Sequence, residues 1–292
     1  MSDISRSPLT PFGSEIHGLA LWSLDDADTF TSLASHWAHD GIMLLRRQAL
    51  SERELLHFSQ HFGTPHIILR DDWQSKDCPE IIKITNMRDY YGESLGALGA
   101  GELDWHTDQS YVTEPATGSI LHMVEMPTSA PKTYWANLQL AYAMLSPSMQ
   151  ARIERLEVVY DYLARQSTYD DEPEMTAELR RRTPPVKHPL VQAHPLTGKR
   201  SLYLDPTTAA YIDGWDEQSS QKLLSELAAY ATQPEFVYAH EWQVGDVVMW
   251  DNAILMHKRD AFDPAGNRLL KRATLRMPPD RHIVPRGALV AW

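Results

Sequence analysis

Short runs of β-branched, aromatic and other apolar residues fill the chain from about residue 80 onwards. They cover 81–84, 119–125, 133–136, 157–162, 201–204, 236–238, 247–250 and 272–276. Proline, glycine, asparagine and aspartate separate many of these runs, and this pattern is typical of a β-sandwich or barrel. The chain is therefore predicted to be mainly β, with a core made of two sheets.

The chain before this region has apolar residues at the spacing of helices. Residues 27–39 place Phe30, Leu33 and Trp37 on one side, and 42–45 form a short apolar strand. Ser51 and Glu54 have the spacing of a capping box, which opens a second helix that ends near 62–65.

Two more helices are predicted, over 138–156 and 216–232. No linker rich in Ser or Gly divides the chain. We therefore expect one domain over residues 1–292, with a helical N-terminal part at about 25–65, a β core at about 80–280 and helices packed outside it.

Charge and composition exclude several classes of protein. The chain has 27 Lys and Arg against 39 Asp and Glu, a formal net charge of −12, which argues against a nucleic-acid partner or an anionic membrane. No apolar run approaches the ~20 residues of a membrane helix, and the first eight residues lack a secretory pattern. Cys78 is the one cysteine, which excludes an internal disulfide. We expect a cytoplasmic protein, in which a local cationic pocket could still bind a small anion.

The strongest chemical feature is Trp105-His106-Thr107-Asp108. Histidine and aspartate two residues apart on an extended segment point to the same side, so both can reach one ion. His257 follows the apolar run 247–250 after a short turn. Two histidines and one carboxylate on one face suit an Fe(II) oxygenase. Each part alone is weak, because His-X-Asp more often lies in a surface loop or makes a structural hydrogen bond.

Three arginines follow His257. Arg268, Arg272 and Arg276 are spaced by four, so on a strand they share one face, with Leu and Ala around them. This arrangement invites an anion. The alternative is a solvated edge strand whose charges face water.

The order of these motifs resembles the taurine dioxygenase (TauD/TfdA) family of Fe(II)- and 2-oxoglutarate-dependent oxygenases, over about residues 12–280. The matching landmarks are Phe62-Gly63, Trp105 to Asp108, Thr133, His188-Pro189, His194-Pro195, Trp250-Asp251-Asn252, His257, Arg268 and Arg272-Ala273-Thr274. The resemblance implies a double-stranded β-helix, which is a jelly roll of the cupin type, forming a single catalytic domain.

The resemblance also implies roles for six residues. It assigns iron ligation to His106, Asp108 and His257, the distal carboxylate of 2-oxoglutarate to Thr133 and Arg268, and an anion of the substrate or cosubstrate to Arg272. Family members often carry Gly-Gly-Asp before the threonine. Here the segment is Ser129-Ala130-Pro131-Lys132, which leaves the geometry of that turn open.

The implied enzyme uses Fe(II), 2-oxoglutarate and O2, abstracts hydrogen from a small anionic organic substrate and releases succinate and CO2. Halogenases of this class replace the carboxylate with a small residue, so Asp108 favours hydroxylation. One alternative is the same cofactor chemistry giving desaturation, epimerisation or cyclisation in natural-product biosynthesis. An alternative of another class is a non-catalytic jelly-roll module that binds a small anion. The sequence leaves the substrate identity and a homo-oligomer open.

The substrate pocket is less well defined by the sequence. His66 stands where family members often have a substrate-facing residue. Glu102, Tyr203 and Asp205 are weaker candidates, and each also has a structural interpretation. Residues 90–104 are rich in glycine and form either a mobile lid over the iron or an ordinary exposed loop.

His188 and His194 raise a further alternative, a second metal site. A proline follows each of them, which favours a turn and a strand instead.

Overall fold

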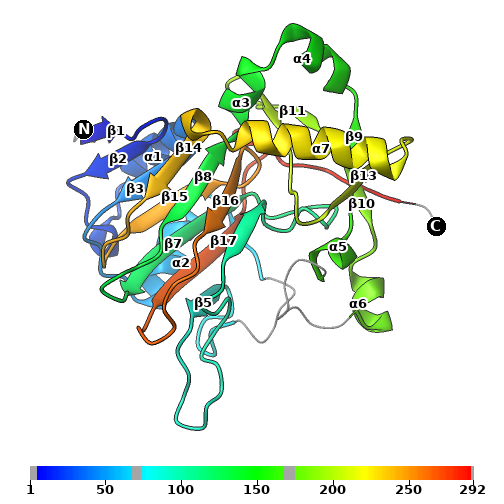
Figure 1. Ribbon diagram of the computed structural model, residues 1–292. Helices are drawn as coiled ribbons and strands as arrows, with labels where there is room; N and C mark the ends of the chain where they lie inside the picture. The colour runs from blue at the N-terminus through cyan, green and yellow to red at the C-terminus, as the bar shows by residue number, and fades with distance from the viewer. Residues whose placement is uncertain (1–4, 68–73, 167–174, 291–292) are drawn as a thin grey trace.

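The computed structural model describes residues 5–67, 74–166 and 175–290, and in it two β-sheets face each other (Figure 1). In the larger sheet the strand order is β1 (Ser5–Pro8), β2 (Ser14–His17), β3 (Ile42–Leu45), β15 (Val247–Asp251), β7 (Gly118–Glu125), β17 (Leu269–Arg276) and β4 (Thr64–Pro65), and β5 (Ile81–Thr85) also pairs with β17. The smaller sheet is β14 (Val237–His240), β8 (Thr133–Asn137), β16 (Leu255–Arg259) and β6 (Leu103–His106). These pairings are antiparallel except that of β2 with β3.

The middle strands of the larger sheet are buried on both faces. In β15, Val248 and Trp250 face the smaller sheet, whereas Val247 and Met249 pack on the opposite side. This alternation follows from the two-residue period of a strand. The core between the two sheets includes Leu44, Leu121, Trp135, Val248, Trp250, Leu255 and Leu270.

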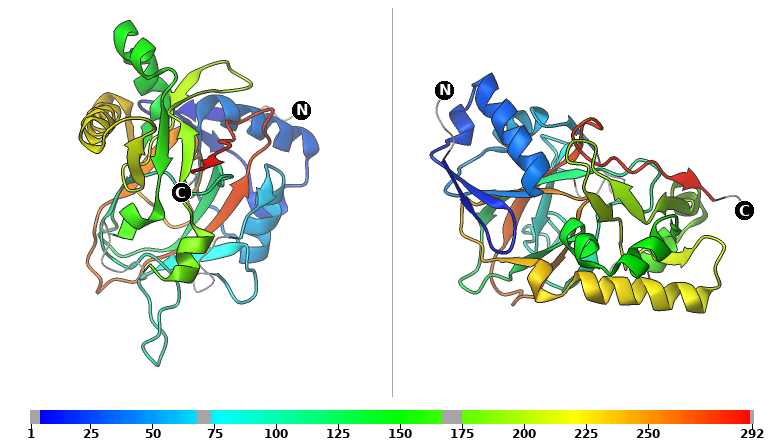
Figure 2. Two further views of the ribbon diagram at one scale, coloured as in Figure 1. Left: turned by 90° about the vertical axis from the view of Figure 1, so that its right-hand side faces the viewer. Right: turned by 90° about the horizontal axis from the view of Figure 1, so that it is seen from above.

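Helices α1 (Ala27–Asp40) and α2 (Glu52–Gln60) pack on the outer face of the larger sheet. The predicted capping box is confirmed, because Ser51 and Glu54 bond each other's backbone N–H groups. Gly41 ends α1 with a φ of 73°, which a side chain would strain. Helix α7 (Glu217–Ala231) lies on the other side of the molecule from α1 (Figure 2).

One predicted helix is wrong in its extent. Residues 138–156 form two helices, α3 (Leu138–Met144) and α4 (Pro147–Ile153). Ser146 caps α4 by accepting a hydrogen bond from the N–H of Met149, and Pro147 occupies the first turn. Proline cannot donate into the preceding helix, so a new one begins there.

Most of the remaining elements form a layer beside the smaller sheet. They are the four-stranded sheet β13 (Ala209–Ile212), β9 (Glu157–Tyr160), β10 (Val186–Pro189) and β18 (Ala288–Leu289), the pair β11 (Val191–Ala193) and β12 (Arg200–Leu202), the helices α5 (Tyr162–Gln166) and α6 (Ala177–Arg182), and the 3-10 turn η3 (Pro234–Phe236). The 3-10 turn η1 (Leu21–Ser23) is the exception, because it packs with α2 on the outer face of the larger sheet. In the described part of the chain, no helix has the length and apolar character needed to cross a membrane. The prediction of a mainly β protein with flanking helices is confirmed.

Candidate active site

His106, Asp108 and His257 meet at the end of the smaller sheet. His106 and His257 are direct partners across β6 and β16, so both rings project from one face and their centroids lie 4.1 Å apart. The Nε2 atoms of His106 and His257 lie 3.8 and 3.9 Å from the carboxylate oxygens of Asp108. One ligand atom from each residue lies within 4.8 Å of the other two, which brings the three predicted ligands together.

The protonation states of these residues suit a metal. Nδ1 of His106 donates to the carbonyl of Asp104 at 2.7 Å, which leaves the Nε2 lone pair free. Burial lowers the pKa of His106 and holds that of His257 well below its ordinary value, so both rings are neutral. Burial alone would raise the pKa of Asp108, but the positive charge around it, of which the guanidinium of Arg272 is the largest part, outweighs burial and keeps the carboxyl ionised. Two neutral imidazoles and one carboxylate form a donor set that fits Fe(II).

Arg272 contacts this group directly. Its Nη1 donates to Oδ2 of Asp108 at 3.1 Å, and both side chains are almost buried. Arg276 is different, because half of its side chain is exposed at the last position of β17 and it pairs with Glu114 at 3.9 Å. The buried cationic cluster therefore contains Arg268 and Arg272 without Arg276.

Arg268 and Thr133 line the same small cavity as His106, His257 and Arg272. Arg268 is 2% exposed, and its guanidinium makes no ion pair with a carboxylate in the described residues. Burial, with Arg259 nearby, lowers the pKa of Arg268 to about 9. A buried guanidinium and a buried hydroxyl at one cavity are donors suited to a carboxylate, which would supply the missing negative charge.

The four pocket candidates lie outside the walls of this cavity. His66 is half-buried and its N–H donates to the carbonyl of Thr274, while Glu102 is exposed. Tyr203 is buried against Tyr160 and His188. Asp205 accepts hydrogen bonds from Ser110, Thr207 and Thr208, and thereby joins two loops. A substrate role for these four residues stays a prediction.

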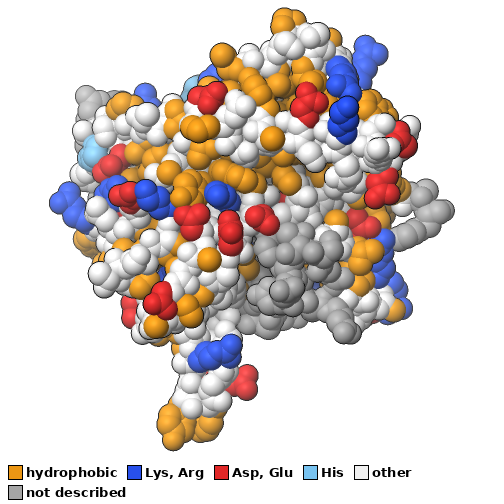
Figure 3. Space-filling model, in the orientation of Figure 1, with side chains coloured by type: hydrophobic (Ala, Val, Ile, Leu, Met, Phe, Trp, Pro, Cys, Tyr) orange, Lys and Arg blue, Asp and Glu red, His pale blue; other side chains and the backbone are white. Residues whose placement is uncertain are grey.

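The glycine-rich segment has two parts. The loop between β5 and β6 stands away from the body (Figures 1 and 3). A bridge between Arg88 and Ser94 closes one turn of it, and within that turn Tyr90 and Tyr91 are 96% and 84% exposed. Leu98, in contrast, lines the cavity, and its carbonyl accepts a 2.9 Å hydrogen bond from Arg259. The base of the segment thus forms part of the cavity wall, and movement of residues 90–104 as a lid stays a prediction.

Comparison with known proteins identifies the family. The family model described as "Taurine catabolism dioxygenase TauD, TfdA family" matches residues 5–274. The chain belongs to this family. An alpha-ketoglutarate-dependent 2,4-dichlorophenoxyacetate dioxygenase of Burkholderia sp. is 34% identical over 277 residues, covering 90% of this chain and 91% of the relative. Pentalenolactone F synthase of Streptomyces avermitilis is 30% identical over 289 residues, covering 92% of each.

A solved structure supports the same conclusion for the TauD/TfdA fold. AAD-2 in complex with Mn(II) and N-oxalylglycine is 26% identical, covers 94% of this chain and 98% of that chain, and superposes with a TM-score of 0.80. The jelly-roll expectation is therefore confirmed. The protein is a 2-oxoglutarate-dependent non-haem iron dioxygenase that uses Fe(II), 2-oxoglutarate and O2.

Two residues beside the site of this dioxygenase were not predicted. Arg259 lines the cavity and is the direct partner of Thr133 across β16 and β8. Arg259 could have been predicted from its position two residues after His257, because residues two apart on a strand share a face. Trp242 donates its indole N–H to the hydroxyl of Thr133. No local pattern marks Trp242, since the contact depends on how distant strands pair.

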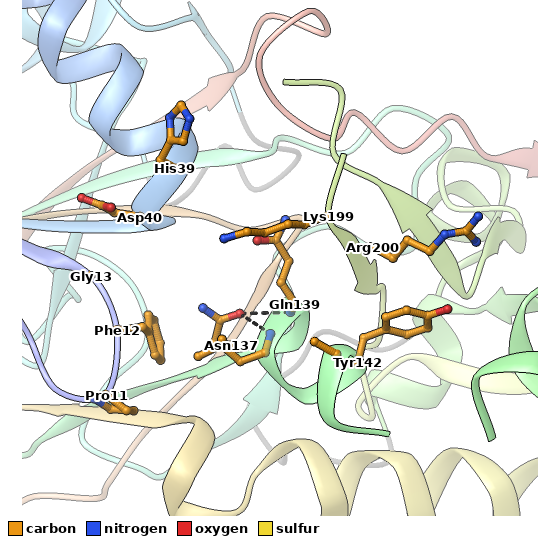
Figure 4. Close-up of a pocket in the computed structure, with 12 residues that line it drawn as sticks. Pro11, Phe12, Gly13, His39, Asp40, Asn137, Gln139, Tyr142, Lys199 and Arg200 are labelled. Atoms are coloured by element: carbon orange, nitrogen blue, oxygen red, sulfur yellow. Dashed lines mark hydrogen bonds between the residues drawn. The ribbon is translucent and has the colours of Figure 1, made fainter. Parts of the chain in front are cut away.

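A larger cavity of about 460 Å³ lies elsewhere in the dioxygenase, between the loop after β1, the end of α1 and the start of α3 (Figure 4). The labelled side chains include Phe12, Asp40, Asn137, Gln139 and Lys199. It shares no lining residue with the small cavity and contains none of the predicted site residues. Its size therefore does not make it the active site.

A second buried cluster joins His194, Asp251 and His282. Nδ1 of His282 donates to Asp251 at 2.8 Å, and Nδ1 of His194 accepts from the N–H of Thr197 at 3.2 Å. The neutral His194 ring then carries its proton on Nε2, so that atom has no lone pair for a metal. This cluster is better explained as structural hydrogen bonding, in agreement with the turn expected at His194-Pro195.

Proposed function

We propose that this dioxygenase hydroxylates a small organic substrate that carries an anionic group, and releases succinate and CO2. The proposed roles are iron ligation by His106, Asp108 and His257, binding of the distal carboxylate of 2-oxoglutarate by Thr133 and Arg268, and binding of a substrate or cosubstrate anion by Arg272. One observation carries the proposal. His106 and His257, which meet Asp108, line one cavity with the buried Arg268, which has no carboxylate partner in the described residues.

Fe(II), 2-oxoglutarate and O2 supply the oxidising chemistry when bound. The chain supplies the ligands of the metal, orients the bound molecules and excludes water. Fe(II) with one aspartate leaves one net positive charge, whereas 2-oxoglutarate brings two negative charges. Arg268 would balance the second negative charge with a planar pair of donors. Apolar walls made by Ile84, Leu98 and Leu121 exclude water and so strengthen that contact.

Positive charge near the proposed ligands supports an anionic substrate. Arg272 lies against Asp108, and the charge of Arg165 on α5 also acts on His106, Asp108 and His257. The Burkholderia relative is named for a substrate with a carboxylate, 2,4-dichlorophenoxyacetate. We therefore propose a carboxylate, sulfonate or phosphonate on the substrate of this chain.

A second outcome of the same chemistry is favoured by one relative. Pentalenolactone F synthase belongs to natural-product assembly. Desaturation, epimerisation or cyclisation would begin with the same hydrogen abstraction, and the ligand set does not distinguish them from hydroxylation. The presence of Asp108, in place of a small residue, disfavours halogenation.

A panel of small anionic acids and amino acids tests the proposal. Each compound is incubated with the Fe(II)-loaded protein, 2-oxoglutarate and O2, and succinate is measured beside the neutral amide of the same compound. We expect at least one anion to increase succinate release while its amide does not. A gain of one oxygen in the product indicates hydroxylation, and a loss of two hydrogens indicates desaturation. Equal stimulation by acids and amides would contradict the anionic substrate.

We also propose that residues 1–292 act as a single catalytic domain in the cytoplasm. The acidic composition and the free, buried Cys78 support an intracellular setting. Whether the protein forms a homo-oligomer is tested by measuring its molecular mass in solution.

A further inference from the structure

Trp242 donates its indole Nε1–H to the hydroxyl oxygen of Thr133 at 2.9 Å, and both side chains are buried. An indole can only donate, whereas a threonine hydroxyl has one proton and two lone pairs. The bond therefore makes Thr133 an acceptor on the side of Trp242. Its own proton is left for another partner, and no acceptor for it is found among the described residues.

The position of Trp242 is held by the turn between β14 and β15. Within this turn Asp246 is fully buried, and its carboxylate accepts from the N–H of Gln243 at 2.8 Å, from His240 at 3.0 Å and from Arg46 at 2.9 Å. His240 is in turn the direct partner of Thr133 across β14 and β8. Sheet pairing and a bonded turn thus fix the indole relative to the hydroxyl before any ligand arrives.

Thr133 lines the cavity that it shares with Arg268. A β-branched side chain has few χ1 rotamers, so the oxygen of Thr133 stays where the strand puts it and only its proton can rotate. An acceptor lone pair occupied by Trp242 removes one direction for that proton. The remaining directions include the cavity, where a carboxylate beside Arg268 would accept it.

We propose that Trp242 is a positioning residue for 2-oxoglutarate, because it directs the hydroxyl proton of Thr133 towards the distal carboxylate. This inference rests on the proposed function, in which Thr133 and Arg268 bind that carboxylate. Trp242 itself is absent from the cavity wall and acts through Thr133.

The test measures binding to the Mn(II)-loaded protein by titration calorimetry. Two ligands are compared, 2-oxoglutarate and 2-oxopentanoate, which carries a methyl group in place of the distal carboxylate. Trp242→Phe keeps an aromatic ring and removes the N–H. We expect Kd for 2-oxoglutarate to rise about 3- to 10-fold, the range for one neutral hydrogen bond, and Kd for 2-oxopentanoate to stay unchanged.

Trp37→Phe is the matched control. Trp37 is also fully buried, and its Nε1 has no hydrogen-bond partner in the described part of the chain, so the substitution changes packing without removing a bond seen there. We expect it to change neither Kd. An equal loss for both ligands in Trp242→Phe would indicate a packing effect and overturn the positioning role.

Three further variants separate positioning from folding. Thr133→Val removes the acceptor, and the double variant Trp242→Phe/Thr133→Val should then bind 2-oxoglutarate as weakly as Thr133→Val alone. An additional loss in the double variant would show that Trp242 acts independently of Thr133. Replacement of Trp242 by 3-benzothienylalanine keeps the shape of the ring and removes only the N–H. Unchanged affinity there would also overturn the inference.

The wild-type protein distinguishes failure of the inference from failure of the proposed function. If it binds 2-oxoglutarate no more tightly than 2-oxopentanoate, the roles of Thr133 and Arg268 are wrong and the inference falls with them. If it prefers 2-oxoglutarate and Trp242→Phe keeps the full preference, only the role of Trp242 is wrong.

Discussion

Arg272 and Asp108 form a buried ion pair at the proposed iron site, with Nη1 and Oδ2 3.1 Å apart and side-chain exposures of 9% and 12%. The same carboxylate faces both histidines. Arg272 and a bound metal ion would therefore both place positive charge on Asp108. This makes the stability of the protein depend on which cations are present.

Arg272→Ala should destabilise the metal-free protein. Its removal leaves a buried carboxylate without its nearest cation, which costs about 3 kcal/mol of the free energy of unfolding. Bound Mn(II) should reduce that loss, because the ion supplies positive charge to Asp108. Urea unfolding with and without Mn(II) measures both effects. Arg276→Ala, at an exposed position, is the control and should change stability by less than about 0.5 kcal/mol. A metal-free Arg272→Ala protein as stable as the wild type would contradict the role of the pair.

Arg268→Met should weaken the binding of 2-oxoglutarate and stabilise the protein that has no ligand bound. Burial lowers the pKa of Arg268 to about 9, so the folded protein disfavours this charge while no anion is bound. An apolar side chain of similar size should raise the free energy of unfolding by about 1–3 kcal/mol. The same change should weaken 2-oxoglutarate binding at least about 30-fold, because a charge-assisted bond is lost. Calorimetry and urea unfolding on one preparation measure both quantities. Unchanged affinity for 2-oxoglutarate would remove Arg268 from the cosubstrate site.

The stability of the protein should fall in acid, partly through His188. Burial lowers the pKa of His188 to about 4, from 6.5 in an exposed ring. Between about pH 6.5 and pH 4, His188 therefore binds a proton in the unfolded chain but stays neutral in the native protein. The stability contribution is complete above pH 6.5 and is lost as the pH falls towards 4, by up to about 3 kcal/mol. His188→Gln keeps a donor for the carbonyl of Val112 but cannot titrate. Its unfolding free energy, measured from pH 7 to pH 4, should fall less steeply than that of the wild type, and identical slopes would contradict the assignment.

The proposed ligand set could be predicted because local chemistry encodes it. His106 and Asp108 are two apart on an extended segment, and His257 follows a strongly apolar strand. Strand geometry then puts His106 and His257 opposite each other. The spacing of Arg268, Arg272 and Arg276 indicated an anion site. The resemblance to the TauD/TfdA family added Thr133, which periodicity alone would not select, and implied the role of Arg268.

Other features could not be predicted, for physical reasons. The bond between Trp242 and Thr133 joins positions 109 residues apart and exists because β14 pairs with β8. Ser146-Pro147 is a sequence pattern that starts a helix, and it marks the break between α3 and α4. The prediction of one helix over 138–156 did not use this pattern. Asp205 was chosen for its residue type, whereas its surroundings make it a hydrogen-bonding centre for Ser110, Thr207 and Thr208.

The ligand set itself is tested most directly by succinate release from 2-oxoglutarate in air, with Fe(II) added. The wild-type protein should form succinate, and His106→Ala and Asp108→Ala should each reduce its rate at least about 1,000-fold while the protein stays folded, because each removes a proposed iron ligand. His57→Ala, at an exposed position of α2, should keep the wild-type rate. Full turnover in His106→Ala or Asp108→Ala would contradict the proposed iron site.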